Sequence, residues 1–533
     1  MSDKHLDEDA AQLAALGYSS EFKREMGLWG NISLGFTYLS PVVGVYTLFA
    51  SQIQVGGPPM VWAFLIVGAG QFMVALVFGE IVSQFPVAGG VYPWSRRLWG
   101  RRWAWMNGWI YMFALFTSIG GIAYGASPFL SAMVDLGSSV NTQIVVALVL
   151  LALASIINYG GTKVVSTAAM IGFGAELGGA VIVGIWLLIH GRHQSLSVLF
   201  DSHGASSPGA YAPAFAAASL VAVFQYYGFE ACGDVAEEVP NPGVQIPKAM
   251  RMTIYIGGAA ATFVVICLVL AIPDMNAAIS GADPNAVLTL LHGAFGSVDK
   301  VVLGVVMISF LSCLVSLQAA ASRLVYSYSR DQMIMGHRVL RKFWQARHVP
   351  PYALALAFVV PGIIVFGSKI SADAVAKIIG FAAIGIYMGF QMVVLAALRA
   401  RIKGWKPSGK FRLGGWGWFV NIAALAWGIT GITIIAWPWG LDRPWGLGWK
   451  ILDSDGNLVS MPWYDTWLVP LSALIVIGAG LFYMLTARPY RHSDRGAGDA
   501  IALAAAMHAK TDSVDTVSTR DADVSGSAEE VTP

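Results

Sequence analysis

The stretch FQYYGFEACGDVAEEVPNP, residues 224–242, decides how the whole chain is interpreted. An apolar run from Ala214 leads into it, and Glu230 follows directly after Tyr-Tyr-Gly-Phe. Two more glutamates, Glu237 and Glu238, follow shortly after. A charge at bilayer depth is energetically expensive, so an intramembrane carboxylate needs either a partner or a functional role.

The composition is that of a polytopic membrane protein. The 533 residues are 56% hydrophobic and 12% charged, whereas an ordinary soluble domain has about 25% charged residues. Mean hydropathy is +0.63, with 59 Gly and 19 Trp, and both residue types are frequent in membrane proteins. Cys232, Cys267 and Cys313 lie in apolar segments without metal-ligand or disulfide spacing, so we interpret them as small buried hydrophobes.

Twelve apolar segments approach the length of about 20 residues that a membrane span needs. They cover residues 29–54, 60–85, 104–134, 141–158, 164–190, 212–233, 251–272, 299–329, 352–367, 374–398, 418–437 and 465–486. If the N-terminus is inside, the outer loops hold few basic residues: Arg192, Lys300, Lys369, Arg443 and Lys450. The positive-inside rule therefore predicts that both termini are cytoplasmic. We expect a multi-pass protein of the plasma membrane.

The segments suggest four regions along the chain. Residues 1–25 form a cytoplasmic N-terminal segment without a cleavable signal peptide, and residues 26–400 hold spans 1–10, the core of the membrane domain. Residues 401–487 hold the last two spans and an outer loop. Residues 488–533 are rich in Ala, Ser, Thr and acidic residues, which predicts a disordered cytoplasmic tail.

Two of the spans are poor continuous helices. In GFTYLSPVVGVYTLF, residues 35–49, Pro41 removes a backbone donor and Gly44 follows three residues later. In the sixth span, Glu230 sits in the middle of the membrane after Gly228. Spans 1 and 6 are five apart, as expected if spans 1–5 and 6–10 are inverted repeats, and paired interruptions point to a central transport site. The alternative is a pair of simple kinks, with Glu230 bonded to a neighbour.

Unwound backbone is tolerated at this depth only where it lines a cavity or is buried in protein. Freed amides at a half-helix start suit a substrate carboxylate or another anionic group. Freed carbonyls and Glu230 suit an ammonium group, and aromatic side chains add cation–π contact. The predicted substrate-binding residues are Ser40, Pro41, Val42, Val43, Gly44, Tyr226, Tyr227, Gly228, Phe229 and Glu230.

Three stretches resemble the amino acid–polyamine–organocation permeases. They are GFEACGDVAEEVPNPGVQIPKAM (228–250), GEIVSQFPVAGGVYPWSRRLWG (79–100) and SRLVYSYSRDQMIMG (322–336). The N-terminal FKREMGLWGNISLGFTYLSP (22–41) is most similar to the amino acid/choline branch, which includes permeases for GABA, choline and related amines.

The resemblance implies an all-α polytopic fold of about twelve transmembrane helices. Its core is a five-plus-five inverted repeat (LeuT-like) with broken helices 1 and 6, working by alternating access. In this scheme the first break receives the substrate carboxylate and the sixth receives the amine. The chain departs from the family in its first break, where Ser-Pro-Val-Val-Gly replaces a turn of small residues. This departure leaves amines and ω-amino acids open as substrates.

Three charged residues have predicted roles in coupling or gating. Lys163, in NYGGTKVVST (158–167), matches the family lysine whose ammonium takes the place of sodium. Lys163 and Glu230 are therefore candidates for carrying a coupling proton, although a lysine at a span end is usually a topology anchor. Glu80 and Arg323 lie toward the inner ends of their spans. They are expected to form an inner-gate ion pair or to be separate helix-end charges.

Glu237, Glu238, Lys248 and Arg251 are expected to form a solvated network in an inner loop. The spans show no nucleophile with its base and no cluster of metal ligands, and the chain has no nucleotide-binding motif. We therefore expect no enzyme activity, no cofactor, no metal site and no nucleic-acid partner.

The sequence predicts a secondary active transporter that imports an amino acid or related amine. Its partners are the small-molecule substrate, a coupling ion that is H+, and the lipid bilayer. The alternatives are an amino acid or amine exchanger and a transport-fold sensor.

Overall fold

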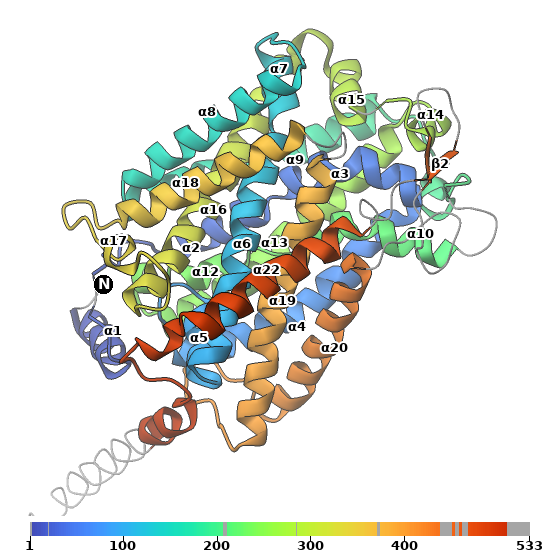
Figure 1. Ribbon diagram of the computed structural model, residues 1–533. Coiled ribbons are helices and arrows are strands. Elements are labelled where there is room, and N and C mark those ends of the chain that lie inside the picture. The colour runs from blue at the N-terminus through green and yellow to red at the C-terminus, as the bar shows by residue number, and fades with distance from the viewer. Residues whose placement is uncertain are drawn as a thin grey trace, which may run out of the picture.

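The helices of the computed structural model form a bundle in which two membrane-crossing paths are interrupted (Figure 1). The structure describes residues 3–19, 21–205, 211–283, 285–369, 374–436, 450–452, 458–460 and 467–508. Among these residues, 11 helical segments are long and apolar enough to cross a membrane, and a shorter apolar one covers Tyr211–Gln225. Each of the twelve predicted segments overlaps one of them.

Among the described residues, ten single helices and two pairs of consecutive helices correspond to the predicted spans. They are α2 (Leu28–Leu39) with α3 (Pro41–Gly56), α4 (Ala63–Gln84), α6 (Arg101–Gly125), α8 (Val140–Tyr159), α9 (Thr162–His190), α10 (Tyr211–Ala218) with α11 (Leu220–Gln225), α13 (Pro242–Ala271), α16 (Asp299–Arg330), α18 (Pro351–Val365), α19 (Ala374–Ile402), α20 (Gly417–Ala436) and α22 (Leu468–Thr486).

Shorter elements connect the membrane helices. They are α1 (Asp3–Ala15), α5 (Val91–Leu98), α7 (Ser127–Met133), α12 (Ala231–Asp234), α14 (Met275–Ser280), α15 (Ala286–Phe295), α17 (His337–Leu340) and the paired antiparallel strands β1 (Lys450–Leu452) and β2 (Leu458–Ser460). We call the end of the bundle with α1 and α5 the α5 face, and the opposite end, with α7 and α15, the α15 face (Figure 1).

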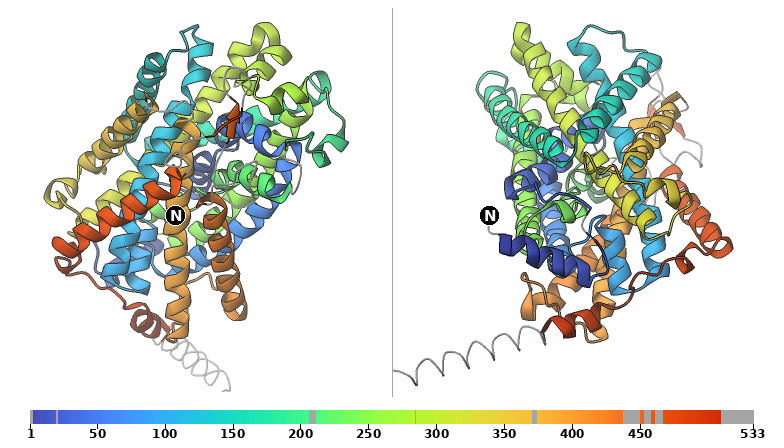
Figure 2. Two further views of the ribbon diagram at one scale, coloured as in Figure 1. Left: turned by 45° about the vertical axis from the view of Figure 1, so that its right-hand side comes forward. Right: turned by 90° about the vertical axis from the view of Figure 1, so that its left-hand side faces the viewer.

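Helices that are far apart in the sequence pack against each other. α6 lies along α19, α4 along α13, and α9 along α16, and the two further views agree with this arrangement (Figure 2). Large apolar side chains on the outside remain exposed, among them Ile182, Ile189 and Phe482. Lipid tails are the natural solvent for such a surface, because an exposed apolar area of this extent is unusual on a soluble monomer. The chain is therefore an all-α, multi-pass membrane protein, as the sequence predicts.

The loop after the sixth span is buried, which corrects the expectation of a solvated network. Glu237 and Glu238 are fully buried, and each binds an arginine of α16. Arg323 Nε lies 2.7 Å from Glu238 Oε1, and Arg330 binds Glu237 through two nitrogens at 2.8 and 3.0 Å. The expectation was wrong because a run of two glutamates is equally compatible with two buried ion pairs, whose arginines come from a distant helix. Lys248 alone is exposed as expected.

The N-terminal segment packs onto the same face. Arg24 donates to the carbonyl oxygens of Ala236 and Val239, and lies 3.9 Å from Asp9. Burial lowers the pKa of the Arg24 guanidinium, while the nearby carboxylates of Asp9 and Glu237 act in the opposite direction. These contacts bind the N-terminal segment to the loop that follows the sixth span, so the segment is part of the α5 face.

The segment after α22 is also ordered as far as residue 508, which corrects part of the predicted disordered tail. Asp499 binds Arg97 at 2.6 Å, and the amide of Gly498 donates to the carbonyl of Arg96. Residues 500–508 are helical, with Ala500 and Ala504 buried. The composition of the tail gives no sign of this contact because alanine serves both a packed helix and a disordered chain. Residues 509–533 lie outside the described part of the chain.

The buried pair Arg323–Glu238 yields a stability prediction. Glu238→Ala should lower the free energy of unfolding by about 3–5 kcal/mol, because it leaves the Arg323 guanidinium buried without its carboxylate. The combined change Arg323→Met with Glu238→Leu should recover most of that loss. The measurement is the apparent melting temperature of the purified protein in detergent.

A matched control is the ion pair Lys300–Asp135, whose side chains are 52% and 75% exposed. Asp135→Asn should change stability by less than about 1 kcal/mol, as for other surface pairs. Equal effects of Glu238→Ala and Asp135→Asn would contradict the assignment of Arg323–Glu238 as a buried structural pair.

Candidate functional site

The first span is interrupted at Ser40. This residue has a left-handed backbone conformation (φ 45°, ψ 89°) and stands between the last residue of α2 and the first of α3. Pro41 cannot donate a backbone hydrogen bond, and its ring clashes with the preceding helical turn, so the helix must restart here. The predicted break in the first span is therefore present at the predicted residues.

The free amides at the start of α3 already have partners within the protein. The amide of Val42 donates to Glu176 Oε1 at 3.0 Å, and the Ser40 hydroxyl donates to the same oxygen at 2.6 Å. The amide of Val43 donates to Ser40 Oγ at 3.3 Å, and that of Gly44 to the Ser40 carbonyl at 3.2 Å. Ser40 thus acts as the N-cap of α3, and a carboxylate from the middle of α9 occupies its positive end.

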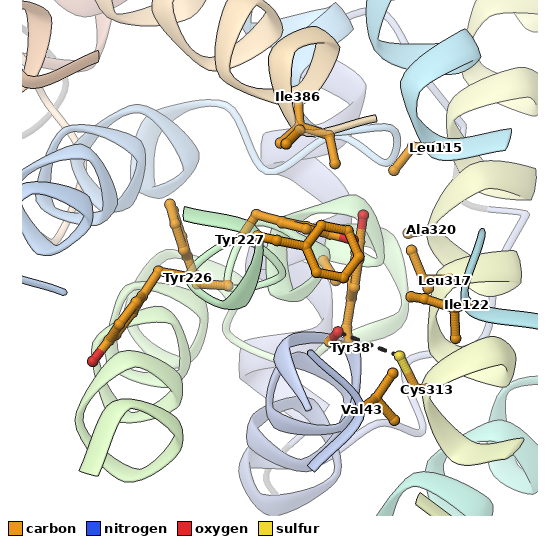
Figure 3. Packing of buried hydrophobic residues seen from close by; sticks show 14 of the residues in the cluster. Tyr38, Val43, Leu115, Ile122, Tyr226, Tyr227, Cys313, Leu317, Ala320 and Ile386 are labelled. Carbon is orange, nitrogen blue, oxygen red and sulfur yellow. Dashed lines mark hydrogen bonds between the residues drawn. The ribbon is translucent and has the colours of Figure 1, made fainter. Parts of the chain in front are cut away.

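The carbonyls freed at the end of α2 also find partners on other spans. Gln225 Nε2 donates to the carbonyl of Leu39 at 2.7 Å. Cys313 Sγ donates to the carbonyl of Tyr38 at 3.5 Å, as the dashed line in Figure 3 shows. The first break is consequently tied to the sixth span and to α16, which satisfies backbone groups that lipid could not satisfy.

The sixth span is interrupted between α11 and α12, and Gly228 makes this break possible. Its φ is +114°, and a Cβ at this position would lie 2.6 Å from the amide nitrogen of Leu39. Only glycine allows both this conformation and this close approach. The two helix breaks, far apart in the sequence, therefore touch in the middle of the bundle.

Glu230 lies inside this second break. It is 0% exposed, and both of its carboxylate oxygens accept hydrogen bonds. The amide of Gly228 donates to Oε2 at 2.7 Å, and the Tyr111 hydroxyl of α6 donates to Oε1 at 2.8 Å. No ion pair among the described residues includes Glu230. The carboxylate is therefore held in place by neutral donors, and its charge has no fixed cation beside it.

Aromatic rings line one side of the breaks. The rings of Tyr38 and Tyr227 meet edge to face at 5.6 Å, and both point toward Leu317 and Ala320 of α16 (Figure 3). The Tyr38 hydroxyl is buried and has no hydrogen-bond partner among the described residues.

Two predicted aromatic residues lie elsewhere. Tyr226 points away from Tyr227 (Figure 3) and packs against Phe64 at 6.3 Å. Phe229 packs between Phe78 and Phe390 at 5.9 and 5.5 Å. The structure thus brings Ser40–Gly44, Tyr227, Gly228 and Glu230 together. Tyr226 and Phe229 instead pack against aromatic side chains of other helices.

A cavity of about 430 Å³ lies on the α15 face. It is lined by uncharged residues of α3, α6, α7 and α15, including Tyr46, Tyr124 and Phe129. The rings of Tyr46 and Phe129 stack with 6.0 Å between their centroids. Tyr46 belongs to α3, the helix that begins at the first break, so α3 connects the cavity to that break.

The predicted coupling and gate residues have separate surroundings. Lys163 is exposed at the start of α9, where its position gives the coupling role no support and agrees with a topology anchor. Glu80 and Arg323 do not meet: Glu80 binds Arg401 of α19, while Arg323 binds Glu238. An inner gate made of Glu80 and Arg323 together is therefore not formed in this structure.

Three residues of the site were missed in the sequence. Glu176 carries the same signal as Glu230, a carboxylate in the middle of an apolar span. Asp234 lies in the quoted stretch, is fully buried, and has no partner for either carboxylate oxygen among the described residues. Tyr111 has no such signal, because tyrosine is common in membrane helices.

Comparison of the sequence with known proteins identifies related permeases. Residues 27–446 match the model of the amino acid permease family. The amino-acid permease BAT1 of Arabidopsis thaliana is 23% identical over 464 residues, covering 81% of this chain and 89% of that protein. A putative polyamine transporter of Candida albicans is 23% identical and covers 84% of this chain and 85% of its own length.

A solved structure shares the fold. It is the manganese transporter of Eremococcus coleocola in complex with an aromatic bis-isothiourea compound, with a TM-score of 0.54 at 10% identity. The match covers 87% of this chain and 94% of that one, so the two proteins share an overall fold. On this fold and on the family match over most of its length, the chain belongs to the amino acid permease family of membrane transporters.

Proposed function

We propose that this permease is a secondary active transporter that imports an amino acid or a related amine across the plasma membrane, driven by protons. Both termini lie in the cytoplasm in this proposal, so the α5 face is the inner one. The observation that carries it is Glu230, a fully buried carboxylate at a helix break whose only described partners are the neutral donors Gly228 and Tyr111. A substrate ammonium group supplies the missing cation.

The conformation supports loading from outside. Ion pairs tie the exit of the sixth span to α16 on the α5 face. On the α15 face, the cavity of about 430 Å³ leads from the surface toward Tyr46. Alternating access requires the α5 pairs to separate when substrate is released, while the two breaks carry the binding site between the faces.

The coupling proton is assigned to the carboxylates of the second break. Asp234 is buried, and neither of its side-chain oxygens has a partner among the described residues. An isolated buried carboxylate is costly in its ionised form, so a proton on it relieves the cost. Glu230 lies only four residues earlier, immediately before α12, which ends at Asp234, and this closeness in the chain links proton binding to substrate binding.

Glu230→Gln should reduce uptake at least tenfold, because loss of a charge-assisted hydrogen bond to the substrate costs about 1.5–3 kcal/mol. The measurement is uptake of radiolabelled alanine, arginine, GABA and putrescine into proteoliposomes with an inward proton gradient and no sodium. Asp201→Asn, a change of an exposed carboxylate, serves as the control and should transport normally.

Other outcomes would revise the mechanism. Uptake only into preloaded vesicles would make the protein an exchanger. Transport that appears only after sodium is added would replace the proton as the coupling ion. Normal uptake by Glu230→Gln would remove Glu230 from the substrate site.

Asp234→Asn mimics the protonated side chain and should separate transport from coupling. We expect exchange of preloaded substrate to persist while stimulation of uptake by the proton gradient falls to less than about twofold. Uptake measured across a series of imposed pH gradients tests this. If Asp234→Asn keeps the stimulation and Lys163→Gln loses it, coupling belongs to Lys163 instead.

A further inference from the structure

The break in the first span already contains a carboxylate that belongs to the protein. Glu176 is 0% exposed, and its Oε1 accepts hydrogen bonds from the Ser40 hydroxyl and the Val42 amide. A carboxylate on the substrate would compete for the same amide and would stand beside a like charge in a medium of low dielectric constant. The structure therefore offers no vacant anion site at the start of α3.

The second carboxylate oxygen of Glu176 is an unused hydrogen-bond acceptor within the described structure. Its Oε2 is buried and has no hydrogen-bond partner among the described residues. No ion pair in the described part of the chain includes Glu176. A buried carboxylate with an unused oxygen calls for a donor, and a cationic donor gives the stronger bond.

The two intramembrane carboxylates flank the same short stretch of backbone. Glu176 binds Ser40, whereas Glu230 binds the amide of Gly228, which lies against Leu39 and Tyr38. The Cα atoms of Tyr38 and Ser40 are at most about 7 Å apart, because an extended chain spans about 3.5 Å per residue. The two carboxylates are therefore bonded beside points of the backbone that lie within the length of a small molecule.

We propose that Glu176 is a specificity residue which excludes carboxylate-bearing ligands from the first break and selects a ligand with two separated ammonium groups. One ammonium group faces Glu176 Oε2, the other faces Glu230, and the methylene chain between them lies against the rings of Tyr38 and Tyr227. This inference rests on the proposed function and narrows its substrate to the class of linear diamines.

Three ligands with the same four-carbon chain test the proposal. They are 1,4-diaminobutane, butylamine and 4-aminobutanoate, which carry two ammonium groups, one ammonium group, and one ammonium with one carboxylate. Affinities are measured as competition against uptake of radiolabelled 1,4-diaminobutane and, independently of transport, as ligand-induced shifts of the melting temperature of the full-length protein. Wild type should prefer the diamine at least tenfold over butylamine, and 4-aminobutanoate should bind most weakly.

Two substitutions of Glu176 separate specificity from structure. In Glu176→Gln, the amide oxygen still accepts from Ser40 and Val42, but a donor replaces the spare acceptor. The preference for the diamine over butylamine should then fall to about onefold while the melting temperature without ligand is kept. In Glu176→Ala, the Val42 amide becomes free, and 4-aminobutanoate should gain at least tenfold relative to the diamine.

The outcomes distinguish this inference from the proposed function. If wild type takes up alanine or 4-aminobutanoate better than the diamine, transport stands and the role of Glu176 is overturned. A uniform loss for all three ligands in Glu176→Gln, with a lower melting temperature, would make Glu176 a purely structural cap and would also overturn it. If wild type neither binds nor transports any amine or amino acid tested, the proposed function itself fails.

Discussion

The contact between Gly228 and Leu39 is the constraint on which the centre of this protein depends. It brings two interrupted helices together at a depth where no water can satisfy free backbone groups. Each break then has to be completed by side chains from other spans, and Gln225, Glu176 and Tyr111 supply the bonds. The polar centre is thus a consequence of the interrupted backbone, and the same groups that satisfy the backbone define what can bind there.

Much of this arrangement could be predicted from the sequence because its causes are local. Pro41 and Gly228 fix the two breaks through their own backbone chemistry, and apolar segments of sufficient length fix the spans. The partners of the breaks could not be predicted in the same way. Glu176 meets Ser40 across 136 residues of sequence, and Tyr111 meets Glu230 across 119. Such pairings depend on how the helices pack, which no local pattern encodes.

The α5 face shows a different limit of sequence reasoning. Charged residues near span ends are normally solvated, and Lys163 and Lys248 behave in that way. Glu237 and Glu238 do not, because they are buried and form ion pairs with Arg330 and Arg323 of α16. The sequence marks these residues as charged, but only the packing of α16 against the sixth span decides that they form structural ion pairs.

Helix α5 contacts both the first and the last described segments of the chain, and this arrangement affects the order in which the protein can fold. Arg97 binds the carbonyl of Leu16 and the carboxylate of Asp499, so a single side chain joins the earliest and latest described segments. Every membrane helix has been synthesised before Asp499 leaves the ribosome. The α5 face therefore gains the bond between Arg97 and Asp499 only after every membrane helix has been made, and a chain truncated before Asp499 lacks this bond.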